Sequence, residues 1–135
     1  MKEFNWSIRV YYEDTDSAGV VYHSNYLRFM ERARTEWLRE LGYSHNRLNE
    51  EENLVFVVSS MNVEFKKPAY FDELLNVNCR ITRLRGTSLV FEQIINNEVN
   101  ETKCRADVYI ACVDVNTFKP KRIPAAIRAE FKHDD

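Results

Sequence analysis

Two carboxylates and a glycine lie close together near the start of the chain. Asp14 and Asp16 flank Thr15, Gly19 follows, and the same short segment runs on to His23. Residues of these types favour turns, and a carboxylate in a turn can bind Ca²⁺, take up a proton or attack a carbonyl carbon. It can also simply close the turn or cap a helix. The segment is therefore the candidate site, and each of these chemistries requires different neighbours.

Metal binding has only partial support in the sequence. A calcium loop of the EF-hand type that starts at Asp14 would have Asp16 and Gly19 at the required positions. The pattern fails at Ala18, which has no side-chain oxygen, and at Asn25, where a bidentate glutamate is needed. No HxxxH or CxxC pair indicates zinc. We therefore predict no metal and no other cofactor. The histidines are His23, His45 and His133.

Serine nucleophiles and glycine-rich phosphate loops are both disfavoured. The chain has only three glycines, and no GxSxG, Walker or GxGxxG motif occurs. What remains is Asp16 in a glycine-containing turn, followed by a predicted helix start at residues 23–25. The first N–H groups of a helix are unpaired and lie at the positive end of its dipole, so they can stabilise a carbonyl oxygen that gains charge. This arrangement suits attack on a thioester, with Asp16 as nucleophile or as general base.

A long amphipathic helix is predicted directly after this segment. Apolar residues recur at steps of three and four over residues 25–41, which is the spacing of one helix face. Ser24 is predicted as the N-cap, and Gly42 as the residue that ends the helix in a left-handed conformation. Before the turn, residues 8–13 alternate apolar and polar side chains, which predicts a strand. The apolar helix face consists of Tyr26, Phe29, Met30, Ala33, Trp37 and Leu41.

Strands dominate the rest of the chain. Four further strands are predicted, and the last three are joined by connections short enough for hairpins, which implies an antiparallel meander. Residues 44–53 are predicted to be a loop or a short helix, and residues 125–131 a short terminal helix. A helix of about 17 residues is roughly 25 Å long and could lie across such a sheet, so we expect an α+β fold. The four strands are residues 54–65, 73–84, 87–96 and 102–115.

Composition excludes several other classes of function. With 19 basic and 21 acidic residues the net charge is −2, and no basic block typical of nucleic-acid binding occurs. The chain is long enough for one core and no linker divides it, so residues 1–135 are predicted to be one domain. No leader or transmembrane segment is indicated, and the cysteines are predicted to be packed thiols, so we expect a cytoplasmic protein. The cysteines are Cys79, Cys104 and Cys112.

Residues 12–26 resemble the signature of the 4-hydroxybenzoyl-CoA thioesterase family. They read Tyr-Glu-Asp-Thr-Asp-x-x-Gly-Val-Val-Tyr-His-x-x-Tyr, a pattern similar to that of the branch found with the bacterial Tol-Pal envelope system. The resemblance covers nearly the whole chain. Beyond the signature, the similar segments are residues 31–36, 63–65, 68–69, 85–91 and 129–132.

The resemblance implies a hotdog fold, in which an antiparallel sheet wraps around one long central helix, and hydrolysis of acyl-CoA. It also implies dimers that commonly pair into tetramers, with active sites at the subunit interface. Carried over by position, the family's catalytic carboxylate is Asp16, and the backbone N–H that polarises the thioester belongs to His23. Asp14 has no such role in the family pattern.

The resemblance also indicates where the substrate binds. Tyr12, Val21 and Tyr22 are expected to shape the channel for the acyl group or the pantetheine arm. For the phosphates of the coenzyme we expect basic residues at strand ends, of which Lys66 and Arg85 are the selected pair, although such charges also occur simply as solvated surface. The wider set of candidates is Lys66, Lys67, Arg83, Arg85, Lys119 and Lys121.

Two other functions fit the same sequence. A thioesterase acting on acyl carrier protein would use the same chemistry, but a net charge of −2 gives no sign of the basic docking patch that such a partner favours. A non-catalytic scaffold that binds acylated partners or lipid-synthesis enzymes would need no carboxylate at Asp16. Hydrolysis of acyl-CoA is therefore the leading hypothesis.

Overall fold

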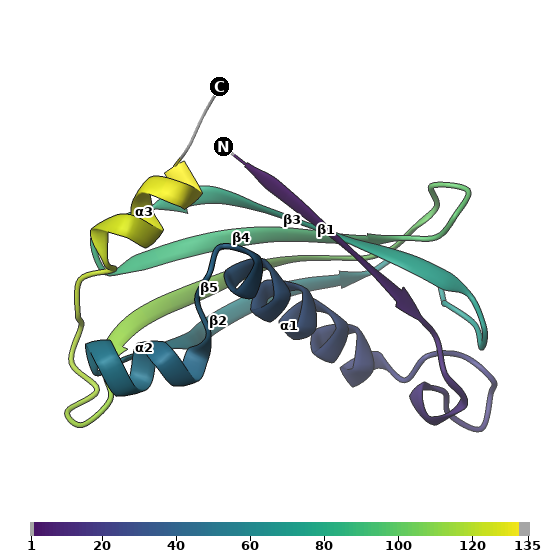
Figure 1. The fold of residues 1–135 in the computed structure, drawn as a ribbon. Helices are drawn as coiled ribbons and strands as arrows, with labels where there is room; N and C mark the ends of the chain where they lie inside the picture. Colours follow the sequence, from purple (N-terminus) through teal and green to yellow (C-terminus); the bar gives the residue numbers. More distant parts are fainter. Residues whose placement is uncertain (1, 133–135) are drawn as a thin grey trace.

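Five strands and three α-helices make up the part of the chain that the structure, a computed structural model, describes, which is residues 2–132. A short 3₁₀ turn, η1 (Tyr12–Asp14), follows the first strand. Figure 1 shows the strands as one curved sheet with the long helix α1 lying along one side of it. The other elements in chain order are β1 (Glu3–Arg9), α1 (His23–Glu40), α2 (His45–Glu52), β2 (Leu54–Phe65), β3 (Leu74–Leu84), β4 (Ser88–Asn96), β5 (Thr102–Asp114) and α3 (Ala125–Lys132).

The sheet is antiparallel throughout, in the order β1-β3-β4-β5-β2. Its last four strands in the sequence have nearly the predicted bounds, and β3, β4 and β5 form the predicted hairpins. The prediction of one continuous meander is wrong for β2, because this strand lies at the far edge and pairs with β5, with Phe65 opposite Cys104. Alternation of side chains indicates a strand but does not indicate its partner, so the crossing was not predictable from the pattern.

The first strand lies earlier in the chain than predicted. β1 pairs with β3 from Glu3 to Arg9, whereas the alternation placed a strand at residues 8–13. After Arg9, Val10 still pairs with the segment before β3, because the Val10 carbonyl accepts a hydrogen bond from the Asp72 N–H at 2.9 Å. The chain then turns into η1. The pattern was misleading because Tyr12 counted as a buried position, although it is 78% exposed.

Helix α1 has nearly the predicted extent, but its start is capped differently. The N-cap is Tyr22, and the predicted cap Ser24 lies inside the first turn. The Asn25 N–H donates to the Tyr22 carbonyl at 2.8 Å, so the backbone closes this turn without a side-chain cap. At the other end Gly42 has φ 95°, as predicted for a residue that ends a helix in the left-handed region.

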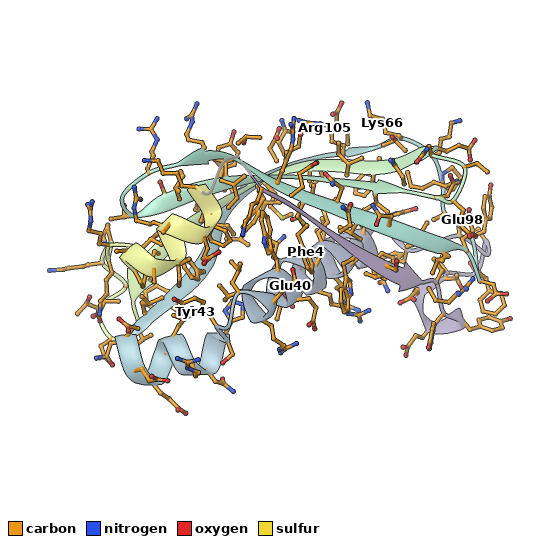
Figure 2. All side chains as sticks on the ribbon, turned by 45° about the horizontal axis from the view of Figure 1, so that its top comes forward. Phe4, Glu40, Tyr43, Lys66, Glu98 and Arg105 are labelled. Carbon is orange, nitrogen blue, oxygen red and sulfur yellow. The ribbon has the colours of Figure 1, made fainter. Side chains whose placement is uncertain are left out.

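The core lies between α1 and the inner face of the sheet. Phe29, Met30 and Ala33 on the predicted helix face are fully buried. Figure 2 shows Phe4 between the sheet and α1, whereas Arg105 lies on the outer side of the sheet. The two short helices lie near the end of the sheet opposite η1 (Figure 1). Among residues 2–132 no helix is long and apolar enough to cross a membrane.

The three cysteines are buried, unpaired thiols in this core, as predicted. Burial raises the pKa of Cys79 and of Cys112 to about 11, and that of Cys104 to about 12. A thiol reacts through its thiolate, so both the raised pKa and the lack of access protect these side chains.

The native chain should therefore resist alkylation. Iodoacetamide at mildly alkaline pH is expected to modify all three cysteines roughly 100-fold more slowly in the folded protein than in guanidinium chloride, because reaction requires local opening of the core. Mass spectrometry of timed samples measures the rates. Rapid modification of any one cysteine in the folded chain would contradict this account of the core.

Candidate active site

A small hairpin connects η1 to α1. The Tyr22 N–H donates to the Asp14 carbonyl at 2.9 Å. Closer to the tip, the Asp16 N–H donates to the Val20 carbonyl at 2.9 Å, and the Gly19 N–H returns a bond to the Asp16 carbonyl at 3.0 Å. Gly19 has φ 80°, a conformation that glycine adopts without steric penalty. The local sequence thus turns the chain tightly and leads it directly into the helix.

Asp14 fastens this hairpin to α1. Its side chain is only 5% exposed. One carboxylate oxygen, Oδ2, accepts the Tyr11 N–H at 2.8 Å, and the other, Oδ1, accepts the side-chain amide of Asn25 at 2.8 Å. A negative charge at this position is also favoured by the dipole of the helix. Asp14 is therefore the structural carboxylate of the pair.

The segment before β3 holds the hairpin from its other side. The Val21 N–H donates to the Ala69 carbonyl at 2.8 Å, and Val20 forms an antiparallel bridge with Tyr70. The Ala69 N–H donates to the hydroxyl of Tyr26 at 3.0 Å, and burial raises the pKa of this phenol. The hairpin and the first turn of α1 are thus joined to the sheet as one unit.

The Asp16 carboxylate, in contrast, is exposed. Its Oδ1 accepts the Ala18 N–H at 2.8 Å, which is the bond of an Asx-turn. In the described part of the chain, its Oδ2 has no hydrogen-bond partner. The turn-forming role and a chemical role are therefore compatible, since one oxygen orients the side chain while the other is open to accept a proton or to attack a carbon.

Helix α1 opens at His23, directly after the hairpin. His23 and Ser24 lie in the first turn, and neither N–H finds an acceptor within residues 2–132. The His23 ring is exposed, and its centroid lies 4.4 Å from that of Tyr22 and 6.1 Å from that of Phe65. The structure therefore places the two predicted catalytic residues in one short segment, with Asp16 in the hairpin and His23 at the helix start that follows it, where the N–H donors are open.

The predicted channel residues lie in two different environments. Tyr12 is 78% exposed, and its ring packs on Phe71 with centroids 5.1 Å apart. Tyr22 is also exposed, so both tyrosines present aromatic surface beside the loop. Val21 is 4% exposed and belongs to the hydrophobic core, so it supports the loop from within.

The predicted phosphate-binding residues lie at opposite ends of the sheet. Lys66 follows Phe65, whose ring contacts the start of α1, and thus lies at the same end as the hairpin. Arg85 lies in the connection between β3 and β4, roughly 33 Å away along β3, where Arg128 of α3 donates to its carbonyl. One copy of the chain therefore does not bring Arg85 to Asp16. Of the other candidates, Lys67 lies beside Lys66, and Arg83, Lys119 and Lys121 lie toward the Arg85 end.

Two supporting side chains were missed in the sequence. Asn25 was predicted to lie at the helix start, but its side chain was considered only as a failed calcium ligand, although its amide joins the helix to Asp14. Gln93 is fully buried, and its Nε2 donates to the Met30 carbonyl of α1 at 3.0 Å. The available signal was a glutamine at an inward position of an alternating strand, where its amide must find a partner. In the described ranges, no group of three His, Cys, Asp or Glu side chains could hold a metal ion.

Known proteins resemble this chain over nearly its whole length. Residues 18–104 match the family model described as "Thioesterase superfamily". The acyl-CoA thioester hydrolase YbgC of Escherichia coli O6:H1 is 50% identical over 129 residues, 96% of each chain. The acyl-CoA thioesterase YbgC of Haemophilus influenzae is 43% identical over 131 residues, 96% of this chain and 95% of its own.

A solved structure agrees with these matches. The crystal structure of a probable thioesterase from Bartonella henselae has a TM-score of 0.85 at 40% identity, covering 91% of this chain and 100% of that one. Together with the five-stranded antiparallel sheet around α1, this likeness confirms the predicted α+β hotdog fold.

Replacing the buried residue Asp14 tests whether its carboxylate stabilises the fold. Asp14→Ala leaves the part-buried Tyr11 N–H and the buried Asn25 amide without an acceptor, and a buried group left unsatisfied costs about 1–3 kcal/mol. We expect the free energy of unfolding to fall by about 2 kcal/mol or more in urea titrations. Glu13→Ala is the matched control, since this neighbouring carboxylate is exposed. Equal stability of the two variants would refute the structural role of Asp14.

Proposed function

The chain belongs to the thioesterase superfamily, and from this premise we propose that it hydrolyses acyl-CoA thioesters to a free acid and coenzyme A. The observation that carries the proposal is the hairpin leading into α1. It presents a carboxylate with one open oxygen, on Asp16, together with the unpaired N–H groups of the helix start. The two relatives named as acyl-CoA thioesterases or hydrolases cover 96% of the chain, which supports the same substrate class.

The proposed mechanism gives each group one task. When the thioester carbon is attacked, its oxygen gains negative charge, and the His23 N–H at the positive end of α1 donates to it. As general base, Asp16 takes a proton from water while the water oxygen bonds to the carbon. The carbon–sulfur bond then breaks, and the thiolate takes up the proton. As nucleophile, Asp16 itself bonds to the carbon and expels the thiolate, and water then hydrolyses the resulting anhydride.

The substrate-binding residues of the proposal follow from their positions. Tyr12 and Tyr22 are proposed to line the channel of the acyl group or pantetheine, which their exposed rings support, with Val21 fixing the backbone behind them. Lys66 is proposed to bind a phosphate of the coenzyme. Its Nζ lies 3.4 Å from Glu64 in an exposed pair, and such a pair is weak enough to exchange for a phosphate.

We further propose that the active form is a homodimer joined along β2, and that dimers pair into tetramers. Within residues 2–132, β2 pairs with β5 alone, so its other edge is free in a single copy. Val58 and Phe65 on this strand are 45% and 53% exposed, and free edges with exposed apolar side chains favour strand pairing with another chain. Two copies of β2 would meet antiparallel about a two-fold axis near Ser60.

Such a dimer would join residues that one copy keeps apart. Antiparallel pairing places the Leu54 end of one β2 beside the Phe65 end of the other. The Leu54 end also carries the connection with Arg85, because the Thr87 carbonyl accepts a bond from β5 there. Arg85 of one copy would therefore approach the hairpin of the other, which supports its assignment to the coenzyme's phosphates and a site shared between subunits.

The cellular setting forms the last part of the proposal. We propose that residues 1–135 act as one domain in the cytoplasm, in the Tol-Pal setting that the signature resembles. Acyl carrier protein is a less favoured substrate carrier, because the net charge of −2 gives no sign of the basic docking patch that such a partner favours. A purely binding role toward lipid-synthesis enzymes is also less favoured, because it leaves the open carboxylate of Asp16 without a use.

Removal of the catalytic carboxylate tests the activity. Asp16→Asn should lower kcat for thiol release from acyl-CoA by about 100-fold or more, because the loss of a positioned base or nucleophile removes that much of the rate. Its stability should change by less than about 0.5 kcal/mol, since the side chain is exposed. The assay uses aliphatic and aromatic acyl-CoA and acyl carrier protein, with Glu13→Gln as control. A folded variant with undiminished rates would disprove the assignment.

Charges placed on β2 test the dimer. Ser60→Asp would set two carboxylates against each other near the two-fold axis, so sedimentation should show monomers and acyl-CoA turnover should fall at least tenfold. A mixture of Ser60→Asp and Ser60→Lys chains should restore both dimers and turnover. Asn5→Asp adds the same charge to β1, the opposite edge strand, and should change neither. A dimeric, active Ser60→Asp protein would rule out this interface.

A further inference from the structure

Lys103 is a buried lysine at the hairpin end of the sheet. It lies near the start of β5 and is only 4% exposed. The register with β4 shifts at this point, because Ile95 lies opposite Cys104 whereas the next residue, Asn96, lies opposite Thr102. Lys103 is therefore the extra residue of a β-bulge, which interrupts the alternation of side chains along a strand. For this reason Lys103 and Cys104 are both buried although they are consecutive.

The ammonium of Lys103 lies among two carboxylates and an aromatic ring. Its Nζ is 3.5 Å from Glu101 and 3.8 Å from the Oε1 of Glu73, and it lies 5.8 Å from the ring centroid of Tyr70. Asn97 joins the two carboxylates, because its Nδ2 donates to Glu101 at 2.8 Å and to Glu73 at 3.5 Å. Since the lysine is buried, solvent and salt screen these attractions only weakly. The cation therefore holds Glu73 and Tyr70 against β5.

Glu73 connects this ion pair to the catalytic hairpin. The same oxygen that faces the lysine, Oε1, accepts the Tyr70 N–H at 2.9 Å. Tyr70 forms the antiparallel bridge with Val20, and the Val20 carbonyl accepts the Asp16 N–H at 2.9 Å. A continuous series of contacts thus leads from Lys103 to the turn that carries the open carboxylate.

Stability alone does not account for a charge at this position. Apolar side chains of similar volume often replace a buried ion pair without loss of stability. An ion pair does fix a direction, because the attraction of the ammonium keeps the Glu73 oxygen beneath the Tyr70 N–H. In catalysis a displacement of about 1 Å can lower the rate by about 100-fold. The orientation of this support is therefore important for the Asp16 turn.

We propose that Lys103 is a positioning residue for the Asp16 turn. It acts through Glu73 and Tyr70, and it is too buried to contact a substrate itself. The inference rests on the proposed hydrolysis of acyl-CoA, in which Asp16 is the nucleophile or the general base.

Kinetics of single variants give the first test. Lys103→Met keeps an apolar side chain of similar length and removes the charge, and it should lower kcat for acyl-CoA about tenfold or more. KM should change by less than twofold, because the Lys66 N–H bonds to the Lys103 carbonyl, which the substitution retains. Lys103→Arg keeps the cation and should retain at least half of kcat. The control is Val108→Ala, at a fully buried position of β5, which should lower Tm and leave kcat within twofold.

A double variant separates positioning from stability. Lys103→Met/Glu73→Gln leaves neither charge of the pair, so its Tm should return toward that of the wild type, whereas kcat should stay about tenfold low. Recovery of kcat together with Tm would overturn the inference. Glu73→Gln alone carries the test if Lys103→Met does not fold, because its side chain is 26% exposed and the amide oxygen still accepts the Tyr70 N–H. An unchanged kcat in that variant would also overturn the inference.

Hydrogen exchange measures the positioning without turnover. The amide protons of Val21 and Tyr70 should exchange at least tenfold faster in Lys103→Met than in the wild type, because the support of the hairpin is loosened. The amide of Ile110, in the middle of β5, should exchange at the same rate in both proteins. Equal rates at Val21 and Tyr70 would overturn the inference. If the wild type hydrolyses no acyl-CoA, the proposed function fails, and these exchange rates alone decide whether Lys103 positions the hairpin.

Discussion

The buried carboxylate of Asp14 is the contact on which the geometry of the site depends. It accepts hydrogen bonds from the backbone before η1 and from Asn25 in the first turn of α1, each at 2.8 Å. A buried charge is stable only while such partners are present, so the loop and the helix cannot separate without leaving it unpaired. Because Asp14 fixes the hairpin against α1, Asp16 can remain exposed with one carboxylate oxygen open. The two neighbouring carboxylates thus differ in their environments, since Asp14 is buried and hydrogen-bonded through both oxygens whereas Asp16 is exposed.

Much of the fold could be predicted because it follows from local patterns. The spacing of apolar residues along α1, Gly42 at its end and the alternation in β2 to β5 are each properties of neighbouring residues. The position of β2 at the sheet edge was not predictable, since it depends on pairing between segments distant in sequence. β1 was misplaced because Tyr12 is apolar in type but exposed in the folded chain, and a sequence pattern cannot distinguish the two.

The candidate site was predictable where its residues lie close together in the sequence, and not where they lie far apart. Asp16 lies in a short hairpin and His23 begins the helix directly after it, so their placement in one segment follows from the turn between them. Lys66 and Arg85 lie on different connections at opposite ends of the sheet, and no feature of the sequence gives that separation. Gln93 was overlooked because its importance comes from burial, which only the packing of α1 against β4 creates.

Hydrogen bonds hold helix α1 at two points, and one of them connects the helix to a buried side chain of the sheet. Asn25 binds it to the loop in the first turn, and Gln93 binds its Met30 carbonyl about 7.5 Å further along the axis. A helix fixed at two points resists both sliding and rotation. An N–H donor stabilises a developing charge only when its direction is set beforehand, so the buried amide of Gln93 serves the helix start although it lies two turns away. The oxygen of the same amide accepts a hydrogen bond from Arg34 at 2.7 Å, so Gln93 holds α1 through a side chain as well as through the backbone.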